Sequence, residues 1–328
     1  MDLNGFVALD KRLNKMMPFI TPTGVIIALF LGSIFTPLKP MVNTLFGIMT
    51  FFGAMKISAK DMVDAIKRPF FILAFVLASY IIMPLCAEVI SLIFFNGNKD
   101  VGSGYNLIRA IPTAVVGSIW ATIYHGNLAV SFAILMLDTA LAPIMTPFLL
   151  KIFTGTTVYV DSVGMMKSLC IMVVIPFILG LVFNHFFAKP IKEKVAPITN
   201  PLSKLILLLV VIINVSQVSN RIVENISWSY LIIAVAAVLL AAAGFPVGKL
   251  SCRIFKLQEK DTIAITFAVA MRNISAALVL AIDFLPPAAA LPVIFSIVFQ
   301  QTTAALMGHA LFGKEPEKVE VQTKAAKA

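Results

Sequence analysis

Long apolar runs cover nearly the whole chain of 328 residues, separated by short charged or turn-forming clusters. A helix needs about 20 mostly apolar residues to cross the hydrocarbon core of a bilayer. Only 13% of the residues are charged, against the roughly 25% typical of soluble domains. The sequence therefore predicts an all-α, polytopic membrane protein with ten transmembrane helices, at residues 18–37, 40–57, 68–95, 104–125, 127–152, 163–187, 197–221, 227–255, 261–284 and 287–312.

Lysine and arginine residues are unevenly divided between the loops on the two sides of the membrane. If the N-terminus is cytoplasmic, most of them fall on the cytoplasmic side, and the outer side holds only Lys39, Lys99, Arg109, Lys151 and Arg221. Because basic residues concentrate in cytoplasmic loops, we predict a multi-pass protein of the inner (plasma) membrane with both termini cytoplasmic. The net charge of +10 is scattered over these loops, which does not favour nucleic acid as a partner.

The predicted spans divide into two sets of five, in residues 18–155 and 160–313. Because five is odd, the second set must cross in the opposite direction, and inverted repeats are a recurrent plan among secondary transporters. The apolar residues of segment 1–17 fall near one helical face, which predicts an amphipathic segment lying on the membrane surface. Residues 314–328 are charged and rich in Lys and Ala, which predicts a disordered cytoplasmic tail.

The fourth span of each predicted half is interrupted. Residues 112–118 of the fourth span read PTAVVGS, and the corresponding stretch of the ninth span contains Met271, Arg272 and Asn273. Backbone groups freed at such breaks are tolerated at membrane depth where they line a cavity or are buried in protein. An ordinary proline kink is the alternative for Pro112. Because the equivalent span of both halves is affected, we predict broken fourth and ninth helices at a transport site.

Arg272 is a fixed positive charge inside an apolar span, and such residues are rare and usually functional. Asp138 is the one good candidate partner, since it lies in another apolar span. Both residues are about 16 Å from the cytoplasmic end of their spans, at 1.5 Å per residue. Two interpretations stay open: a structural ion pair that locks two helices, and a charged pair within a transport site.

Polar and small residues near the two breaks are the candidate substrate-binding groups. Hydrogen bonding between helices is the alternative role for such residues. The candidates are Thr113, Gly117, Ser118, Asn273 and Gln300.

Several motifs, in order and spacing, resemble the bile acid:sodium symporter family over nearly the full length. Residues 47–61 (GIMTFFGAMKISAKD) are similar to that family's second span and following loop, and residues 80–84 (YIIMP) to its third span. Residues 112–139 resemble the broken fourth span and the fifth, and residues 271–278 (MRNISAAL) resemble a ninth-span motif. The resemblance implies a panel domain, a core domain with crossed fourth and ninth helices, and alternating access for organic anions.

The positions that bind two sodium ions in that family are only partly kept. Ser131 matches a fifth-span serine, whereas a ninth-span glutamate and glutamine fall on Ala268 and Arg272. Other family positions fall on Ser79, Gly117, Ser118 and Leu135. Losing an acid and adding a guanidinium disfavours a second cation. We therefore expect the guanidinium to take a sodium ion's place, with sodium as an alternative, and name Ser131, Asp138, Met271 and Arg272 as ion-site or charge-pair residues.

The sequence therefore predicts a secondary active transporter of a small organic anion, a bile-acid-like or other carboxylate. A sodium-independent or proton-coupled carrier is one alternative, and a non-transporting membrane receptor is another. An enzyme is not expected, because intramembrane catalysis needs paired acids, a Ser/His constellation or metal ligands, and Asp138 has no second acid or histidine near its depth. No cofactor is predicted. The expected partners are the organic anion and the lipid bilayer, and no sequence feature indicates an oligomeric state.

Overall fold

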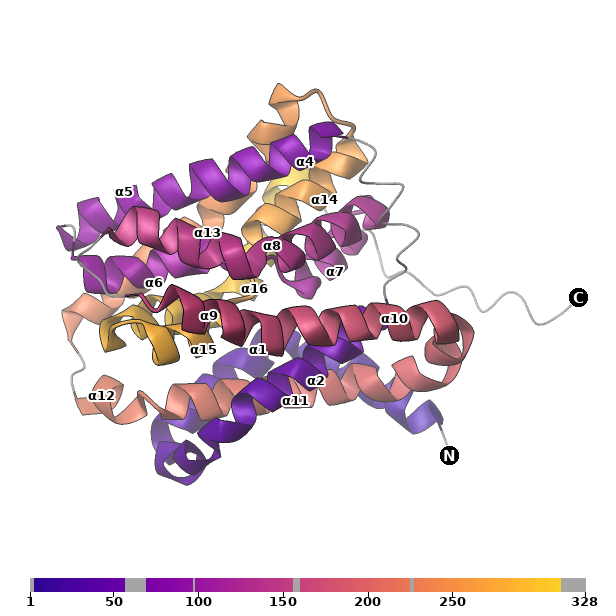
Figure 1. Ribbon diagram of the computed structural model, residues 1–328, viewed down its shortest axis with the longest axis horizontal. Helices are drawn as coiled ribbons and strands as arrows, with labels where there is room; N and C mark the ends of the chain where they lie inside the picture. Colours follow the sequence, from indigo (N-terminus) through magenta and orange to yellow (C-terminus); the bar gives the residue numbers. More distant parts are fainter. Residues whose placement is uncertain (1–2, 57–68, 97, 156–159, 225–226, 314–328) are drawn as a thin grey trace, which may run out of the picture.

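The computed structural model describes residues 3–56, 69–96, 98–155, 160–224 and 227–313. All regular elements in these residues are helices, and extended backbone pairs only in one isolated bridge (Figure 1). The predicted disordered tail, 314–328, and the whole loop between the second and third predicted spans, 58–67, lie outside the described residues. The protein is therefore all-helical, as the sequence predicts.

Seven helical stretches among the described residues are long and apolar enough to cross a membrane. They do not include the two interrupted spans, whose helices are shorter, and one stretch takes in both the first and the second predicted span. The stretches are Pro22–Ala54, Pro69–Phe95, Leu128–Thr154, Ser162–Ala188, Glu193–Ser216, Trp228–Ile254 and Pro287–Phe312.

One group of helices forms the lower part of the molecule in Figure 1. It contains α1 (Leu3–Phe35), which η1 (Thr36–Met41) joins to α2 (Val42–Ala54), together with α10 (Ile175–Pro190) and α11 (Ala196–Ser216). Helix α1 is continuous through residue 17, so the structure shows no boundary between the predicted surface segment and the first span. The membrane-surface placement of residues 1–17 stays a prediction.

Helices from the two halves of the chain run parallel within this group. Along α1, Asp10 pairs with Lys204, and further on Gly32 lies against Ser219, just beyond the end of α11. Along α2, Gly47 lies against Pro176, and the Met55 carbonyl accepts a hydrogen bond from Asn184, further along α10. In both pairs, therefore, a helix of the first half of the chain runs parallel to the helix of the second half against which it packs.

The second group of helices contains the two interrupted spans and the helices packed around them. Helix α13 packs against α14, α16 and α5, and α8 packs against α6, α7 and α14. Its members are α4 (Pro69–Val76), the π-helical η2 (Leu77–Ile82), α5 (Met83–Phe95), α6 (Lys99–Ala110), α7 (Val115–Ile123), α8 (Leu128–Thr154), α13 (Trp228–Ile254), α14 (Glu259–Ala270), α15 (Ile274–Phe284) and α16 (Ala290–Phe312). The remaining elements are α9 (Ser162–Leu169), η3 (Cys170–Val174), η4 (Ile191–Val195), α12 (Ser219–Glu224) and η5 (Pro287–Ala289).

Two glycines one turn apart let α13 approach α14 closely. A Cβ at Gly244 would lie 2.8 Å from the Cα of Ala270, and one at Gly248 would lie 2.9 Å from the Cα of Thr266. Small residues at this spacing are a common means of bringing membrane helices together, because lipid gives no hydrophobic drive for their association. This contact holds α14, and with it the second break, against α13.

Candidate functional site

The two interrupted spans cross at their breaks. Helix α6 ends at Ala110 and α7 begins at Val115, whereas α14 ends at Ala270 and α15 begins at Ile274. The extended residues between them pair as an antiparallel bridge centred on Thr113 and Arg272. Pro112 lacks a backbone N–H and cannot continue the helix.

The bridge satisfies the backbone groups that the breaks set free. The N–H of Ala114 donates to the carbonyl of Met271 (2.8 Å), and the N–H of Asn273 donates to the carbonyl of Pro112 (2.9 Å). An unpaired backbone group costs several kcal/mol in a membrane interior. Each break therefore supplies hydrogen-bond partners for backbone groups of the other.

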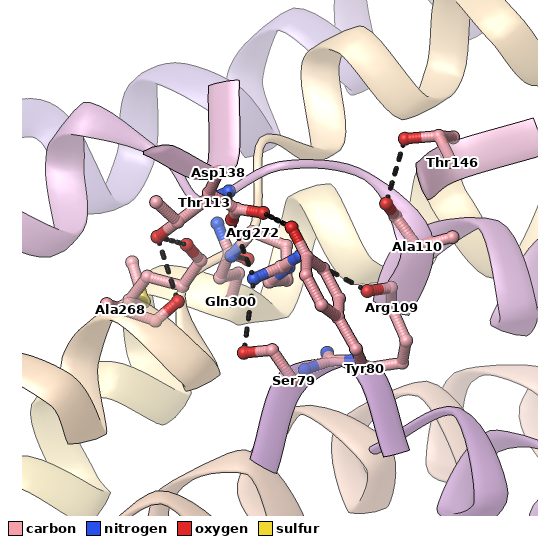
Figure 2. A network of polar contacts seen from close by, with 11 residues as sticks. Ser79, Tyr80, Arg109, Ala110, Thr113, Asp138, Thr146, Ala268, Arg272 and Gln300 are labelled. Atoms are coloured by element: carbon pink, nitrogen blue, oxygen red, sulfur yellow. Dashed lines mark hydrogen bonds and ion pairs between the residues drawn. The ribbon is translucent and has the colours of Figure 1, made fainter. Parts of the chain in front are cut away.

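Asp138 of α8 faces this crossing, and three donors converge on its carboxylate. Its Oδ1 accepts a hydrogen bond from the Tyr80 hydroxyl (2.5 Å), and its Oδ2 accepts one from the backbone N–H of Thr113 (2.6 Å). The same Oδ2 lies 3.1 Å from Nη1 of Arg272. Figure 2 shows these groups meeting between the helices. Because Asp138 is 1% exposed, the contacts take the place of water around its charge.

The Arg272 guanidinium lies at the C-terminal end of α6. Its Nη2 donates to the backbone carbonyl of Arg109 (3.3 Å), and its Nη1 makes a long contact with the Ser79 hydroxyl (3.5 Å). Helix C-termini carry partial negative charge, which favours a cation there. Arg272 is 1% exposed, and it therefore has a carboxylate and a helix end as compensation for its burial.

Thr113 binds the opposite helix end. Its hydroxyl lies 2.8 Å from the carbonyl of Ala268 and 3.0 Å from that of Met271, at the C-terminus of α14. The backbone N–H of Arg272 in turn donates to Oε1 of Gln300 on α16 (3.1 Å). The side chain of each bridge residue thus reaches the end of the other half's broken helix.

A π-helical turn brings two further residues into this network. Element η2 interrupts the helix between α4 and α5 and contains both Ser79 and Tyr80. Such turns often occur at functional sites. Sequence reasoning did not single out Tyr80 as a site residue. Its place in the YIIMP motif is the signal that could have found it.

The structure brings most of the predicted site residues together. Thr113, Asp138, Met271, Arg272 and Gln300 share the contacts described above. Asn273 caps α15 by accepting from the N–H of Ala276 (3.3 Å). Gly117 packs against α14, where a Cβ would lie 3.2 Å from the Phe267 carbonyl, and Ser118 follows it on α7.

Ser131 is not part of this network. It lies seven residues before Asp138 on α8, about 10 Å away along the helix axis. Its buried Oγ has no hydrogen-bond partner among the described residues. The structure therefore does not join this predicted ion-site residue to the charged pair.

The structure corrects the placement of Arg109. The count of basic residues places it on the outer side, but Arg109 is 1% exposed in the last turn of α6, and its carbonyl accepts a hydrogen bond from Arg272. Its burial could have been predicted, because Arg109 lies inside residues 104–125, which the sequence predicts to be a membrane span. The helix that carries it is covered by α5, α8 and α16, so the side chain cannot reach the surface.

A small cavity of about 90 Å³ lies beside Tyr80 and Asp138. Its other lining residues are apolar and belong to α4, η2 and α8: Ile72, Phe75, Val76, Ile134, Leu137 and Leu141. Pockets for organic ligands measure roughly 300–1,000 Å³. This cavity has room for a few water molecules, and an organic solute does not fit beside the carboxylate in this conformation.

Several backbone carbonyls at the crossing already accept hydrogen bonds from side chains of the protein. The side chains of Leu135 and Ala268 carry no oxygen, and the carbonyls of Ala268 and Met271 accept the Thr113 hydroxyl. The carbonyl of Arg109 accepts from the guanidinium. Donors of the protein itself therefore occupy oxygens that would otherwise be free for a cation.

Comparison with known proteins gives a consistent result. Residues 42–225 match the model of the sodium bile acid symporter family. The uncharacterized protein YbaS of Bacillus subtilis is 33% identical over 90% of this chain and 96% of its own length. An uncharacterized sodium-dependent transporter of the same organism, YocS, is 28% identical over 81% of each chain. A probable chloroplastic sodium/metabolite cotransporter of rice, BASS2, is 26% identical over 94% of this chain and 72% of its own length.

The matched family consists of membrane transporters and not of enzymes, which agrees with the apolar helices and with the functional class expected from the sequence. A transporter of this kind has a small-molecule substrate and membrane lipid as its partners. From the family match and from its identity with YbaS, the chain belongs to the sodium bile acid symporter family.

Proposed function

We propose that this protein is a secondary transporter that carries a small organic anion across the membrane by alternating access. The observation that carries the proposal is the buried Arg272–Asp138 pair, 3.1 Å apart, at the crossing of two interrupted spans. Charged residues within membranes are costly and mark substrate and ion pathways. A pair that only locked two helices would not need the interrupted backbone that surrounds it.

The anion would bind on the side of the crossing where α7 and α15 begin. Both helices start within a few residues of the bridge, and the N-terminal ends of broken helices favour anionic groups of transported substrates. Helix α7 starts without a side-chain cap, next to Gly117 and Ser118. Thr113, Asn273 and Gln300 contribute by fixing the shape of this region.

The Arg272 guanidinium takes the place of a coupling cation in this proposal. It lies where a carboxylate, a hydroxyl and a helix C-terminal carbonyl converge. In other transporters, the C-terminal ends of half-helices bind sodium ions or protons. Transport should then be independent of sodium. A proton gradient with Asp138 as the proton acceptor is the alternative driving force.

The proposed architecture has ten spans in two inverted halves, residues 18–155 and 160–313, with both termini cytoplasmic in the inner membrane. Two observations support it. The interrupted helices α6–α7 and α14–α15 occupy equivalent places in the halves. Helix α1 is parallel to α11, and α2 is parallel to α10. Successive spans of a ten-span protein cross the membrane in alternating directions. The first and seventh spans (α1 and α11) must then be parallel, and so must the second and sixth (α2 and α10).

Uptake by the purified full-length chain in liposomes tests the function. Straight-chain monocarboxylates, their amides and bile acids, each isotope-labelled, would be offered with an imposed sodium gradient, with a proton gradient, and with neither. We expect saturable uptake of an anion that does not change when choline replaces sodium. The relatives named as sodium-dependent or sodium cotransporters give the opposite expectation. A steep requirement for two sodium ions would show that Arg272 does not take the cation's place.

A further inference from the structure

Arg109 is a second buried guanidinium beside the crossing. Arg109 and Arg272 head the fully buried side chains of the described residues by size. Nε and Nη1 of Arg109 have no hydrogen-bond partner among the described residues. Buried charges are normally paired, because an isolated one is costly. Nothing in the transport proposal above uses this side chain.

The Arg272 guanidinium contacts the backbone of Arg109. Nη2 of Arg272 contacts the backbone carbonyl of Arg109 itself (Figure 2). The Arg109 side chain extends to α13, where a Cβ at Gly244 would lie 3.4 Å from its Nη1. At this distance a Cβ would make an ordinary contact with the guanidinium, so Gly244 marks how near the side chain comes to α13. The Arg109 side chain therefore lies between its own helix, α6, and α13. It is not a member of the Arg272–Asp138 pair.

The charges of this network do not balance. The residues drawn in Figure 2 include two guanidinium groups, Arg109 and Arg272, and one carboxylate, Asp138. The nearby Glu88 carboxylate is already paired with Lys99 and accepts a hydrogen bond from Asn106. The network therefore has one excess positive charge. The C-terminal end of α6 compensates part of it, but carries no full negative charge.

We infer that the transported solute is a monoanion, and that Arg109 sets this preference without touching the solute. The inference rests on the transport function proposed above and adds the charge of its substrate. A single carboxylate bound at the start of α7 and α15 neutralises the excess charge, a neutral solute leaves it, and a dianion reverses its sign. In a region with little water, each mismatch weakens binding.

Binding of a matched series of solutes tests this inference. The probes are straight-chain monocarboxylates of four to six carbons, their amides, and the α,ω-dicarboxylates of the same length. The readout is the ratio of their affinities for the purified full-length protein, measured by competition with uptake in liposomes. The ratio is informative because loss of folding reduces the amount of uptake without changing the ratio of affinities, whereas loss of a charge changes that ratio.

Three variants remove charged groups of the network, and a fourth keeps every charge. Arg109→Met removes the excess charge, and we expect the preference for monocarboxylate over amide to fall by about tenfold. Arg109→Lys keeps the charge and should keep the preference. Asp138→Asn adds an excess charge and should shift the preference toward dicarboxylates. The double variant Arg109→Met with Asp138→Asn restores a single excess charge and should regain the monocarboxylate preference.

Lys151→Met is the matched control, because it removes a charge from an exposed position at the end of α8. It should leave the order of affinities unchanged. If Arg109→Met retains the full monocarboxylate preference, or if the wild type prefers dicarboxylates, the inference is overturned and the transport proposal stands. If the wild type binds amides better than any carboxylate, or binds no carboxylate at all, the proposed anion transport itself is wrong.

Discussion

Thr113 and Arg272 have reciprocal roles in the two interrupted spans. Each donates its backbone N–H to a side-chain oxygen of the next long helix, Thr113 to Asp138 and Arg272 to Gln300. The side chain of each residue also binds the C-terminal carbonyls of the other half's broken helix. The two halves thus share one hydrogen-bonding plan at the crossing, and differ in that one half supplies a hydroxyl where the other supplies a full positive charge.

Removing one charge of the Arg272–Asp138 pair should destabilise the protein more than removing both. Asp138→Leu leaves Arg272 buried without its carboxylate, and loss of one partner of a fully buried pair costs roughly 3–5 kcal/mol. Asp138→Leu combined with Arg272→Met removes both charges, and we expect clearly less destabilisation and no transport. Thermal unfolding in detergent and uptake in liposomes measure the two effects. If the destabilisation of the double variant equals the sum of the single ones, the two residues are not coupled.

The Tyr80 hydroxyl should matter because it is one of three donors to Asp138. Tyr80→Phe removes a 2.5 Å hydrogen bond to an ionised group, which costs about 1.5–3 kcal/mol, and we expect slower transport as well. Tyr105→Phe is the matched control, since its hydroxyl donates to the Ile233 carbonyl (2.8 Å) away from the pair. It should cost about 1 kcal/mol and leave transport per folded molecule unchanged. Equal effects of both variants on transport would contradict a special role for Tyr80.

The Thr113 hydroxyl should stabilise the C-terminal end of α14 by hydrogen bonding to its carbonyls. Thr113→Val keeps the shape of the side chain and the backbone bridge but removes the donor to two carbonyls, so we expect a loss of about 1–2 kcal/mol. Thr113→Ser keeps the hydroxyl and serves as the control. Chemical or thermal unfolding in detergent measures the difference. A valine variant as stable as the serine variant would show that these carbonyls find other donors.

Much of this site follows from sequence patterns, and the reasons are physical. Arg272 and Asp138 are conspicuous because charge is rare in apolar spans, and their equal depth made contact feasible. Pro112 marks the break because it cannot continue a helix. The reciprocal bonds of Thr113 and the π-helical turn carrying Tyr80 depend on which helices meet in space. No local pattern specifies that, so the sequence could not predict them.

Arg109 shows how a sequence rule can mislead. Counting basic residues by loop assumes that each side chain reaches water, and Arg109 does not. The match of Ser131 to a family position predicted an ion site; the structure places its hydroxyl outside the network of the charged pair, and its ion-site role stays a prediction. Individual roles at such positions depend on neighbours from other helices, which a motif does not contain.

The proposed topology can be tested by labelling single cysteines in intact cells. Asp100, at the start of α6, and Lys194, before α11, are both exposed, and the ten-span arrangement puts them on opposite sides of the membrane. We expect a membrane-impermeant thiol reagent to label Asp100→Cys from outside and to label Lys194→Cys only after permeabilisation. Labelling of both from the same side would contradict the inverted halves.

The central claim is that the Arg272 guanidinium takes the place of a cation, and sodium-dependent thermal stability tests it most directly. In Arg272→Gln, the Asp138 carboxylate, the Ser79 hydroxyl and the Arg109 carbonyl lose their guanidinium partner and become free to bind a metal cation. Replacing choline with sodium, up to about 150 mM, should raise the unfolding temperature of this variant by a few degrees and leave the wild type unchanged. A wild type that sodium stabilises, or a glutamine variant that does not respond to sodium, would contradict the claim.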